Sequence, residues 1–216
     1  MYERPEFFSG GVYHVYNRGV AKQPLFNDET DYHLFLQALS YYFENVPGSS
    51  LTTARKQELF KTILHHNPLD PLVEILAYCL MPNHFHLVVR QLKDGGISTW
   101  MRRSMNSYTR AYNTRHHRVG TMFQGTFQAL HVSNDQYLLH LTRYVHLNPF
   151  VAKLSHGPEY IWSSFSSYRT ATQTRLCHPE LVLGMIGGTE KYDQFIVDYG
   201  DYAQSLPVIK DLLFEE

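Results

Sequence analysis

The chain has 216 residues, of which 44% are hydrophobic and 18% are charged, enough for one well-packed domain or a domain with an appended segment. No basic-then-apolar leader and no apolar run long enough to span a bilayer is present, so we expect a cytoplasmic protein without a membrane partner. Its two cysteines, Cys79 and Cys177, form neither a disulfide framework nor a Cys-x-x-Cys metal site, which agrees with a reducing compartment.

The formal net charge of -1 conceals a separation of charge along the chain. Residues 95–134 contain no Asp or Glu, whereas residues 190–216 contain seven carboxylates. The near-neutral total argues against a protein that binds polyanions over its whole surface, but the middle third is a basic block. The arginines of this block are Arg102, Arg103, Arg110, Arg115 and Arg118.

Alternating apolar and polar residues predict a first strand over residues 10–20. Asn27 and Asp28 can cap a helix over residues 29–46. Its apolar stripe is predicted to comprise Leu34, Leu36, Leu39 and Phe43. A Pro-Gly-Ser-Ser break follows, and residues from about 47 to 70 are predicted as a helical insertion at the surface.

A hairpin is predicted next, with strands over residues 74–80 and 84–90 joined at a Pro-Asn corner. Side chains alternate along a strand, so His84 and His86 share one face, ~6–7 Å apart. The apolar residues between and after them face a core on the other side. Two imidazoles side by side on a rigid strand are suited to hold one metal ion or one phosphate, although such a pair also occurs on solvated sheet faces.

Two helices and a strand complete the first 150 residues. A helix is predicted over residues 96–116, with an apolar stripe that comprises Ile97, Met101, Met105, Tyr108 and Tyr112. Residues 121–132 have a strand pattern, with Gly125 as a candidate bulge. The last helix is predicted over residues 133–149, because Ser133 and Gln136 have capping-box spacing and Pro149 ends it.

The predicted order is strand, helix, strand, strand, helix, strand, helix. This order is typical of an α+β fold: a ferredoxin-like, split βαβ antiparallel sheet with an appended helix. We therefore predict a domain over residues 1–154 and a helical C-terminal extension over residues 155–216, packed on or near it. In this plan the histidine strand is central, beside the first strand, and the appended helix can cover its exposed face.

On that last helix Tyr144 and Asn148 are four residues apart, so they project from one face. Tyr137 and His140 continue this face toward the helix start. A phenol beside a metal-bound phosphate is a suitable nucleophile, and an amide oxygen can complete a metal site. The alternative for Tyr144 is an amphipathic residue at the edge of the core, which is a common place for one of 16 tyrosines.

Four segments carry a family resemblance: "YHVYNRG", "YCLMPNHFHLVV", "SYTRAYNTRHHRVGTMFQGTFQ" and "YLLHLTRYVHLNP", in this order between Tyr13 and Pro149. Together they resemble the tyrosine transposases of the HUH single-strand endonuclease superfamily. The likeness is strongest to the REP-associated tyrosine transposases and their insertion-sequence relatives. His84 and His86 match the histidine-hydrophobe-histidine motif, Tyr144 matches the nucleophile, and Asn148 stands where the family has a third metal-ligand amide.

The resemblance implies a metal-dependent endonuclease and strand transferase that acts on single-stranded DNA, often with hairpin structure, and associates with the nucleoid when bound. It implies Mg²⁺ or Mn²⁺ on His84, His86 and Asn148, and attack by Tyr144 to leave a 5′-phosphotyrosine. The five arginines of the basic block are then expected to contact DNA phosphates. The family includes both monomers and homodimers, so the oligomeric state stays open.

Two other classes of protein remain as alternatives. A zinc hydrolase would use the same histidines, but it needs another strong ligand and a carboxylate that activates water, and residues 95–134 contain no carboxylate. A non-catalytic nucleic-acid-binding module of the same fold would use aromatic side chains on its central strands, where this chain has histidines.

Overall fold

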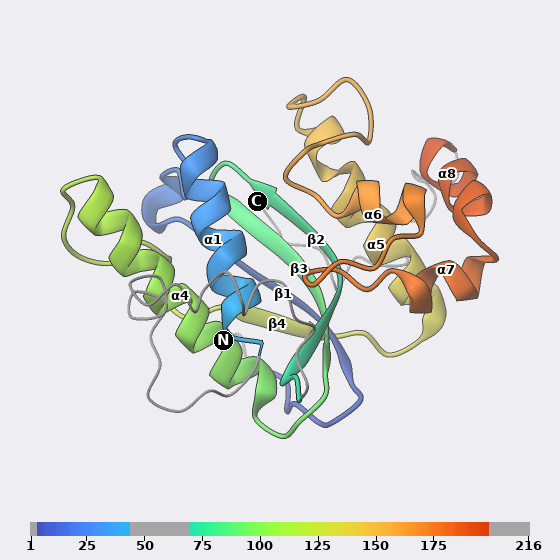
Figure 1. Cartoon of the computed structure of the whole chain (residues 1–216), viewed down its shortest axis with the longest axis horizontal. Coiled ribbons are helices and arrows are strands. Elements are labelled where there is room, and N and C mark those ends of the chain that lie inside the picture. The colour runs from blue at the N-terminus through green and yellow to red at the C-terminus, as the bar shows by residue number, and fades with distance from the viewer. Residues whose placement is uncertain (1–3, 44–69, 199–216) are drawn as a thin grey trace.

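The computed structural model describes residues 4–43 and 70–198. It contains a four-stranded antiparallel sheet in the order β2-β3-β1-β4. The strands are β1 (Val12–Arg18), β2 (Val73–Met81), β3 (His84–Gln91) and β4 (Gln128–His131). Figure 1 shows the predicted α+β, ferredoxin-like arrangement, with the histidine strand β3 in a central position beside β1. The predicted insertion at about 47–70 lies outside the described residues apart from Asp70, as does the end of the predicted C-terminal extension.

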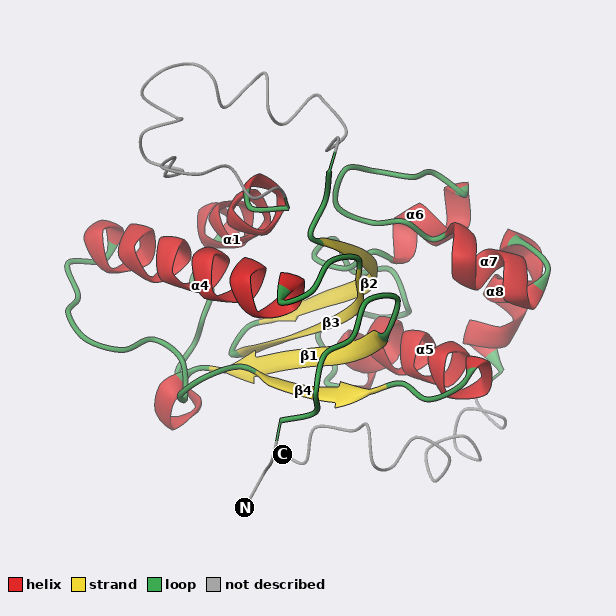
Figure 2. Ribbon diagram, turned by 90° about the horizontal axis from the view of Figure 1, so that it is seen from below, coloured by secondary structure: helices red, strands yellow, loops and turns green. Residues whose placement is uncertain are grey.

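Helices cover both faces of the sheet (Figure 2). One face is covered by α1 (Glu29–Tyr41) and α4 (Gly96–Arg115), and a short helix η1 (Val20–Lys22) follows β1. The other face is covered by α5 (Asp135–Val151), which packs on β2 and β3. Beyond α5 lie α6 (Phe165–Thr170), α7 (Glu180–Ile186) and α8 (Thr189–Val197). Among the helices that the structure describes, none has the length and apolar character needed to cross a membrane.

Each face of the sheet has its own hydrophobic core. Phe85, Leu87 and Val89 point from β3 into the core beneath α1 and α4, as their alternation predicts. The stripe predicted for α1 is partly wrong, because Leu34 and Leu36 are only half-buried. Phe35 takes the central place instead, and its ring lies 5.1 Å from that of Phe85. Larger aromatic rings thus fill the space that the prediction gave to leucines.

The predicted boundaries of α5 are corrected at both ends. Its N-cap is Asn134, whose side-chain oxygen accepts a hydrogen bond from Tyr137 N at 2.9 Å, so Ser133 and Gln136 form no capping box. Pro149 lies inside the helix, which continues to Val151. Proline has no backbone N–H, so the helical bond from residue 149 to the carbonyl of residue 145 is missing, and α5 ends two residues after the proline.

The predicted strand over residues 121–132 is shorter in the structure, where only Gln128–His131 is β4. Gly125 has a φ of 83° and lies in the turn before the strand, so it is not a bulge within it. Phe123 still makes an isolated antiparallel bridge to Gly19. The segment therefore runs along the end of β1 before it joins the sheet as an edge strand.

The described part of the C-terminal extension is attached to the sheet through the open edge of β2. Leu80 N donates to Trp162 O at 2.9 Å, and Ser164 N donates to Tyr78 O at 3.0 Å. These bonds cover an edge that would otherwise present unpaired backbone groups. The division of the chain at residue 154 stays a prediction, although α5 and the following helices share one core.

A buried histidine on α5 connects three parts of this second core. His146 Nδ1 lies 2.7 Å from the Tyr192 hydroxyl of α8, and its Nε2 lies 2.8 Å from Ser164 Oγ beside β2. Burial lowers the pKa of His146 to about 3, so the ring is neutral in the folded protein at physiological pH. This neutral ring joins the helix that carries Tyr144 to its surroundings.

The first prediction concerns acid stability. Between pH ~6.5, the ordinary pKa of histidine, and pH 3, the unfolded chain takes up a proton at His146 that the folded chain excludes. The free energy of unfolding should therefore fall as the pH decreases, by up to ~1.4 kcal/mol per pH unit for this group. In His146→Gln, urea unfolding at pH 7 and pH 5 should show a smaller loss on acidification than in the parent. The exposed His156 supplies the control, since His156→Gln should keep the parental pH dependence. If His146→Gln also kept it, His146 would not be the group that causes the loss of stability.

Candidate active site

The pairing of β1 with β3 assembles a row of polar side chains on the face that α5 covers. Tyr16 pairs with His86 and Arg18 pairs with His84. Residues directly opposite in an antiparallel pair lie on the same face of the sheet. His14, two residues before Tyr16, lies on this face as well, diagonal to His86. Three side chains from β1 therefore share the face of the sheet on which the two predicted histidines lie.

The two histidines are close, buried and neutral. Their ring centroids lie 4.9 Å apart. Burial lowers the pKa of His84 to about 4, with a further contribution from the nearby Arg18 guanidinium. Burial also lowers the pKa of His86 well below its ordinary value, and the neighbouring His14 and His84 add to this shift. Neutral imidazoles keep a lone pair, which a metal ligand requires.

The structure brings Tyr144 and Asn148 to the histidines, as the sequence predicts. The Tyr144 ring centroid lies 5.4 Å from that of His86, and Asn148 Nδ2 lies 3.4 Å from His86 Nε2. Both residues are partly exposed, whereas Val145 and Leu147 on the same helix are fully buried. Part of each side chain is therefore open to solvent, while their neighbours on the helix are held in the core.

The predicted continuation of this face toward the helix start is wrong for His140. Its ring lies 5.6 Å from that of Phe195, so it packs against α8. Tyr137 is half-buried and packs against the core that α5 shares with the C-terminal helices. The cluster over the histidines thus consists of Tyr144 and Asn148 from α5, with nothing added by the first turns.

The predicted DNA-binding arginines lie elsewhere. Arg102, Arg103 and Arg110 are on α4, which covers the opposite face of the sheet (Figure 2). Arg115 has carboxylate partners after all, because Asp28 and Asp31 of the α1 region accept from it at 2.6 and 2.8 Å. The expectation that no carboxylate balances this block therefore fails for Arg115. The last of the set, Arg118, lies over the ring of Tyr112 at 5.5 Å.

Sequence reasoning missed the contribution of the first strand. His14, Tyr16 and Arg18 alternate in "YHVYNR", which places them on one face, and the strand was expected beside the histidine strand. This alternation was the available signal. Arg18 is further connected to Gln124, whose side-chain oxygen accepts from its Nε. The site therefore has a cationic group that the basic block does not include.

The donor set can be compared with the needs of a divalent ion. Among the described residues, no group of three or more His, Cys, Asp or Glu side chains is arranged to hold a metal. The candidate ligands are instead two neutral imidazoles and the Asn148 amide, a mixed nitrogen and oxygen set that suits Mn²⁺ better than Mg²⁺. A structural zinc site, with four protein ligands, does not fit this set.

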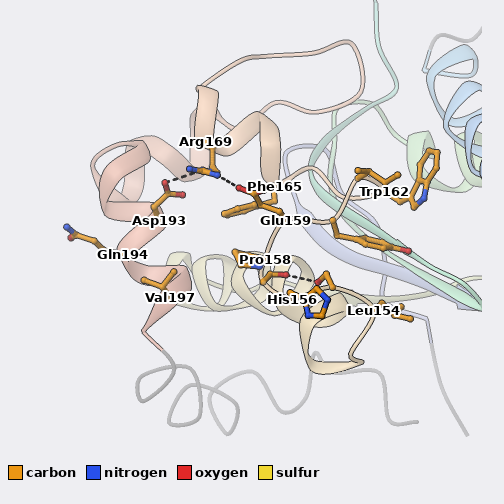
Figure 3. A pocket seen from close by; sticks show the side chains of 14 residues that line it. Leu154, His156, Pro158, Glu159, Trp162, Phe165, Arg169, Asp193, Gln194 and Val197 are labelled. Carbon is orange, nitrogen blue, oxygen red and sulfur yellow. Dashed lines mark hydrogen bonds and ion pairs between the residues drawn. The ribbon is translucent and has the colours of Figure 1, made fainter.

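A large cavity of about 890 Å³ lies away from this site, between residues 154–162, α6 and α8 (Figure 3). Trp162 and Phe165 contribute apolar surface to it. Its cation, Arg169, forms ion pairs with Glu159 and Asp193, so its charge is balanced. The cavity lacks the arrangement found over β3, where a tyrosine lies above a pair of histidines. The site over β3 is therefore the candidate active site.

Comparison with known proteins relates part of the chain to one family. Residues 48–148 match the family model described as "Transposase IS200 like". Among solved structures, the REP-associated tyrosine transposase bound to a REP hairpin is similar, with a TM-score of 0.55 and 17% sequence identity over 78% of this chain and 84% of that chain. No curated protein matches the chain. Residues 48–148 therefore resemble IS200-like transposases, and the fold of the chain is similar to that of a REP-associated tyrosine transposase.

The second prediction separates structural from solvated arginines. Asp31 is fully buried and accepts from Arg115 and His116. Arg115→Gln leaves this buried carboxylate with a weakened set of partners, so the free energy of unfolding should fall. The exposed Arg110 on the same helix is the matched control, and Arg110→Gln should change it by less than ~0.5 kcal/mol. Equal stability of the two variants in urea would show that the ion pairs contribute nothing.

Proposed function

We propose that this chain is a metal-dependent endonuclease and strand transferase for single-stranded DNA, which cleaves through a 5′-phosphotyrosine at Tyr144. The observation that carries the proposal is the position of Tyr144 and Asn148 over two buried, neutral histidines. The match of residues 48–148 to the IS200-like transposase model supports a transposase-like, DNA-binding protein. The similar solved protein is bound to a REP hairpin, which supports hairpin-associated DNA as the substrate.

In the proposed reaction the Tyr144 oxygen attacks the phosphorus of the scissile phosphate. A bond from the tyrosyl oxygen to phosphorus forms, the bond from phosphorus to the 3′ oxygen breaks, and a 3′-hydroxyl leaves. The energy of the phosphodiester is kept in the new ester, so a DNA hydroxyl can later reverse the step without another energy source. The buried side chains on both sides of Tyr144 hold α5 in place, so the phenol approaches the phosphate from one direction.

The phenol has an ordinary pKa near ~10, so its attack needs assistance. Held by His84, His86 and Asn148, a divalent ion, Mg²⁺ or Mn²⁺, would offset the negative charge that develops on the phosphate. Arg18 pairs with His84 across β1 and β3, so its cation lies beside the histidines. Its guanidinium is suited to a phosphate oxygen beside the reacting one.

The basic residues of α4 act outside the site in this proposal. Arg102, Arg103, Arg110 and Arg118 contact DNA phosphates away from the reacting strand, whereas Arg115 serves the ion pairs with Asp28 and Asp31. Tyr144 and both histidines come from one chain, so the site needs no residue from a second copy. A homodimer is therefore not required for cleavage.

The third prediction tests the nucleophile. Tyr144→Phe removes one oxygen and keeps the ring, so folding and affinity for a single-stranded hairpin should be unchanged. Covalent protein–DNA adduct and nicking should disappear together, because the attacking oxygen is removed. Tyr137→Phe, on the same helix, should keep both. Incubation with Mn²⁺ and labelled hairpins, followed by denaturing gels and peptide mapping, measures both products.

Each other outcome of that experiment points to a different class of protein. Nicking without an adduct would indicate a water nucleophile, as in a hydrolase. Binding without nicking in the parent, whichever divalent metal is added, would indicate a non-catalytic DNA-binding module. An adduct mapped to a tyrosine other than Tyr144 would refute the assignment of the nucleophile.

The fourth prediction tests the metal ligands. In calorimetric titrations with Mn²⁺, the parent should bind one ion, and His84→Ala or His86→Ala should lose this binding, because each removes one of two imidazole ligands. His156→Ala, an exposed histidine outside the site, should bind like the parent. Equal binding in all four proteins would rule out the assigned metal site.

A further inference from the structure

We propose that His14 is a positioning residue for this site: it holds His86 in the tautomer whose Nε2 lone pair faces Asn148 and Tyr144. The consequence for metal binding rests on the proposed function. The tautomer itself is a property of the free protein. It can therefore be tested even if the protein binds no metal.

The contact between His14 and His86 is direct and shielded from water. His14 Nε2 lies 3.0 Å from His86 Nδ1, and the rings are nearly parallel, with centroids 5.2 Å apart and an angle of 22°. Both side chains are fully buried. Tyr16, from the same strand, lies beside the pair with its ring centroid 4.9 Å from that of His14. Water therefore does not compete for the hydrogen bond between the two rings.

The second nitrogen of His86 decides the direction of that hydrogen bond. His86 Nε2 lies 3.4 Å from Asn148 Nδ2, and an amide nitrogen can only donate. With the amide turned in this way, His86 Nε2 accepts and the ring carries its proton on Nδ1. That proton is donated to His14 Nε2, which must hold a lone pair. The chain of donors thus runs from Asn148 through His86 to His14, and only one tautomer of each ring satisfies it.

His84 has the same arrangement through a different partner. Its Nδ1 lies 2.7 Å from the side-chain oxygen of Asn83, so His84 donates from Nδ1 and keeps its lone pair on Nε2. Both candidate ligands therefore have Nδ1 bound by an uncharged acceptor and Nε2 left as the basic nitrogen. An uncharged acceptor adds no negative charge behind the ligand, unlike the carboxylate found behind many metal-bound histidines. The site can therefore take up a phosphate without repulsion from a carboxylate at these positions.

A role of His14 in packing alone predicts a different result from a role in positioning His86. If His14 only filled space, any side chain of similar size would replace it, and the tautomer of His86 would not depend on the choice. Position 14 therefore offers a matched pair of variants. His14→Gln keeps an oxygen that can accept from His86 Nδ1, whereas His14→Leu has similar bulk and no acceptor.

The fifth prediction is the state of His86 in the metal-free protein. Long-range proton–nitrogen correlation spectra of nitrogen-labelled histidines distinguish the two tautomers, and the His86 signals are identified by their loss in His86→Ala. We expect the Nδ1-protonated form in the parent and in His14→Gln, and a population of the Nε2-protonated form in His14→Leu. A parent with the proton on Nε2 would overturn the proposal, and this measurement requires no variant of His14 to fold.

Metal affinity supplies the second measurement. His14→Leu should bind Mn²⁺ roughly ten- to a hundredfold more weakly than the parent, and His14→Gln should recover most of the loss, with urea unfolding as the check that both fold. Equal affinity in His14→Leu and the parent would refute a positioning role. If the parent shows the expected tautomer but binds no Mn²⁺, the proposed metal chemistry fails while the assignment of His14 stands.

Discussion

The register between β1 and β3 is the constraint on which the rest of the site depends. Strand side chains alternate, so a shift by one residue would turn His84 and His86 into the core beneath α1 and α4 and expose Phe85, Leu87 and Val89 to the other face. Burial of these three apolar side chains opposes such a shift. The hydrophobic core on one face therefore fixes the geometry of the polar site on the other. The register between β1 and β3 therefore does not depend on an interaction within the site.

The site is buried but carries no negative charge of its own. Burial keeps the histidines neutral, and their Nδ1 atoms are bound by neutral groups. The fully buried carboxylate of Asp31 lies on the α1 side, where Arg115 and His116 contact it. A phosphate that enters beside Arg18 thus meets a cation and the dipoles of neutral histidines. An anionic substrate is the kind of ligand that such a site favours.

Periodicity in the sequence was sufficient for much of this arrangement. Alternation placed His84 and His86 on one face, four-residue spacing placed Tyr144 with Asn148, and the order of elements gave the topology of the sheet. Contacts that depend on register or on distant partners could not be obtained in this way. His14 meets His86 across 72 positions and along a diagonal, and Arg115 meets Asp31 across 84. The cap of α5 was misplaced by one residue because Ser133 and Asn134 both suit an N-cap.

The separation of the basic helix from the histidines restricts how DNA can lie on this protein. The arginines of α4 and the tyrosine of α5 are on opposite faces of the sheet (Figure 2), so a ligand that contacts both must pass around an edge. The β2 edge is covered by residues 160–164, whereas β4 is the other edge strand. The segment from α4 to β4 reaches the histidine face at Gln124, whose side-chain oxygen accepts from Arg18. Gln124 therefore connects the segment that follows α4 with Arg18 of the site, on the side of the sheet where β4 is the edge strand.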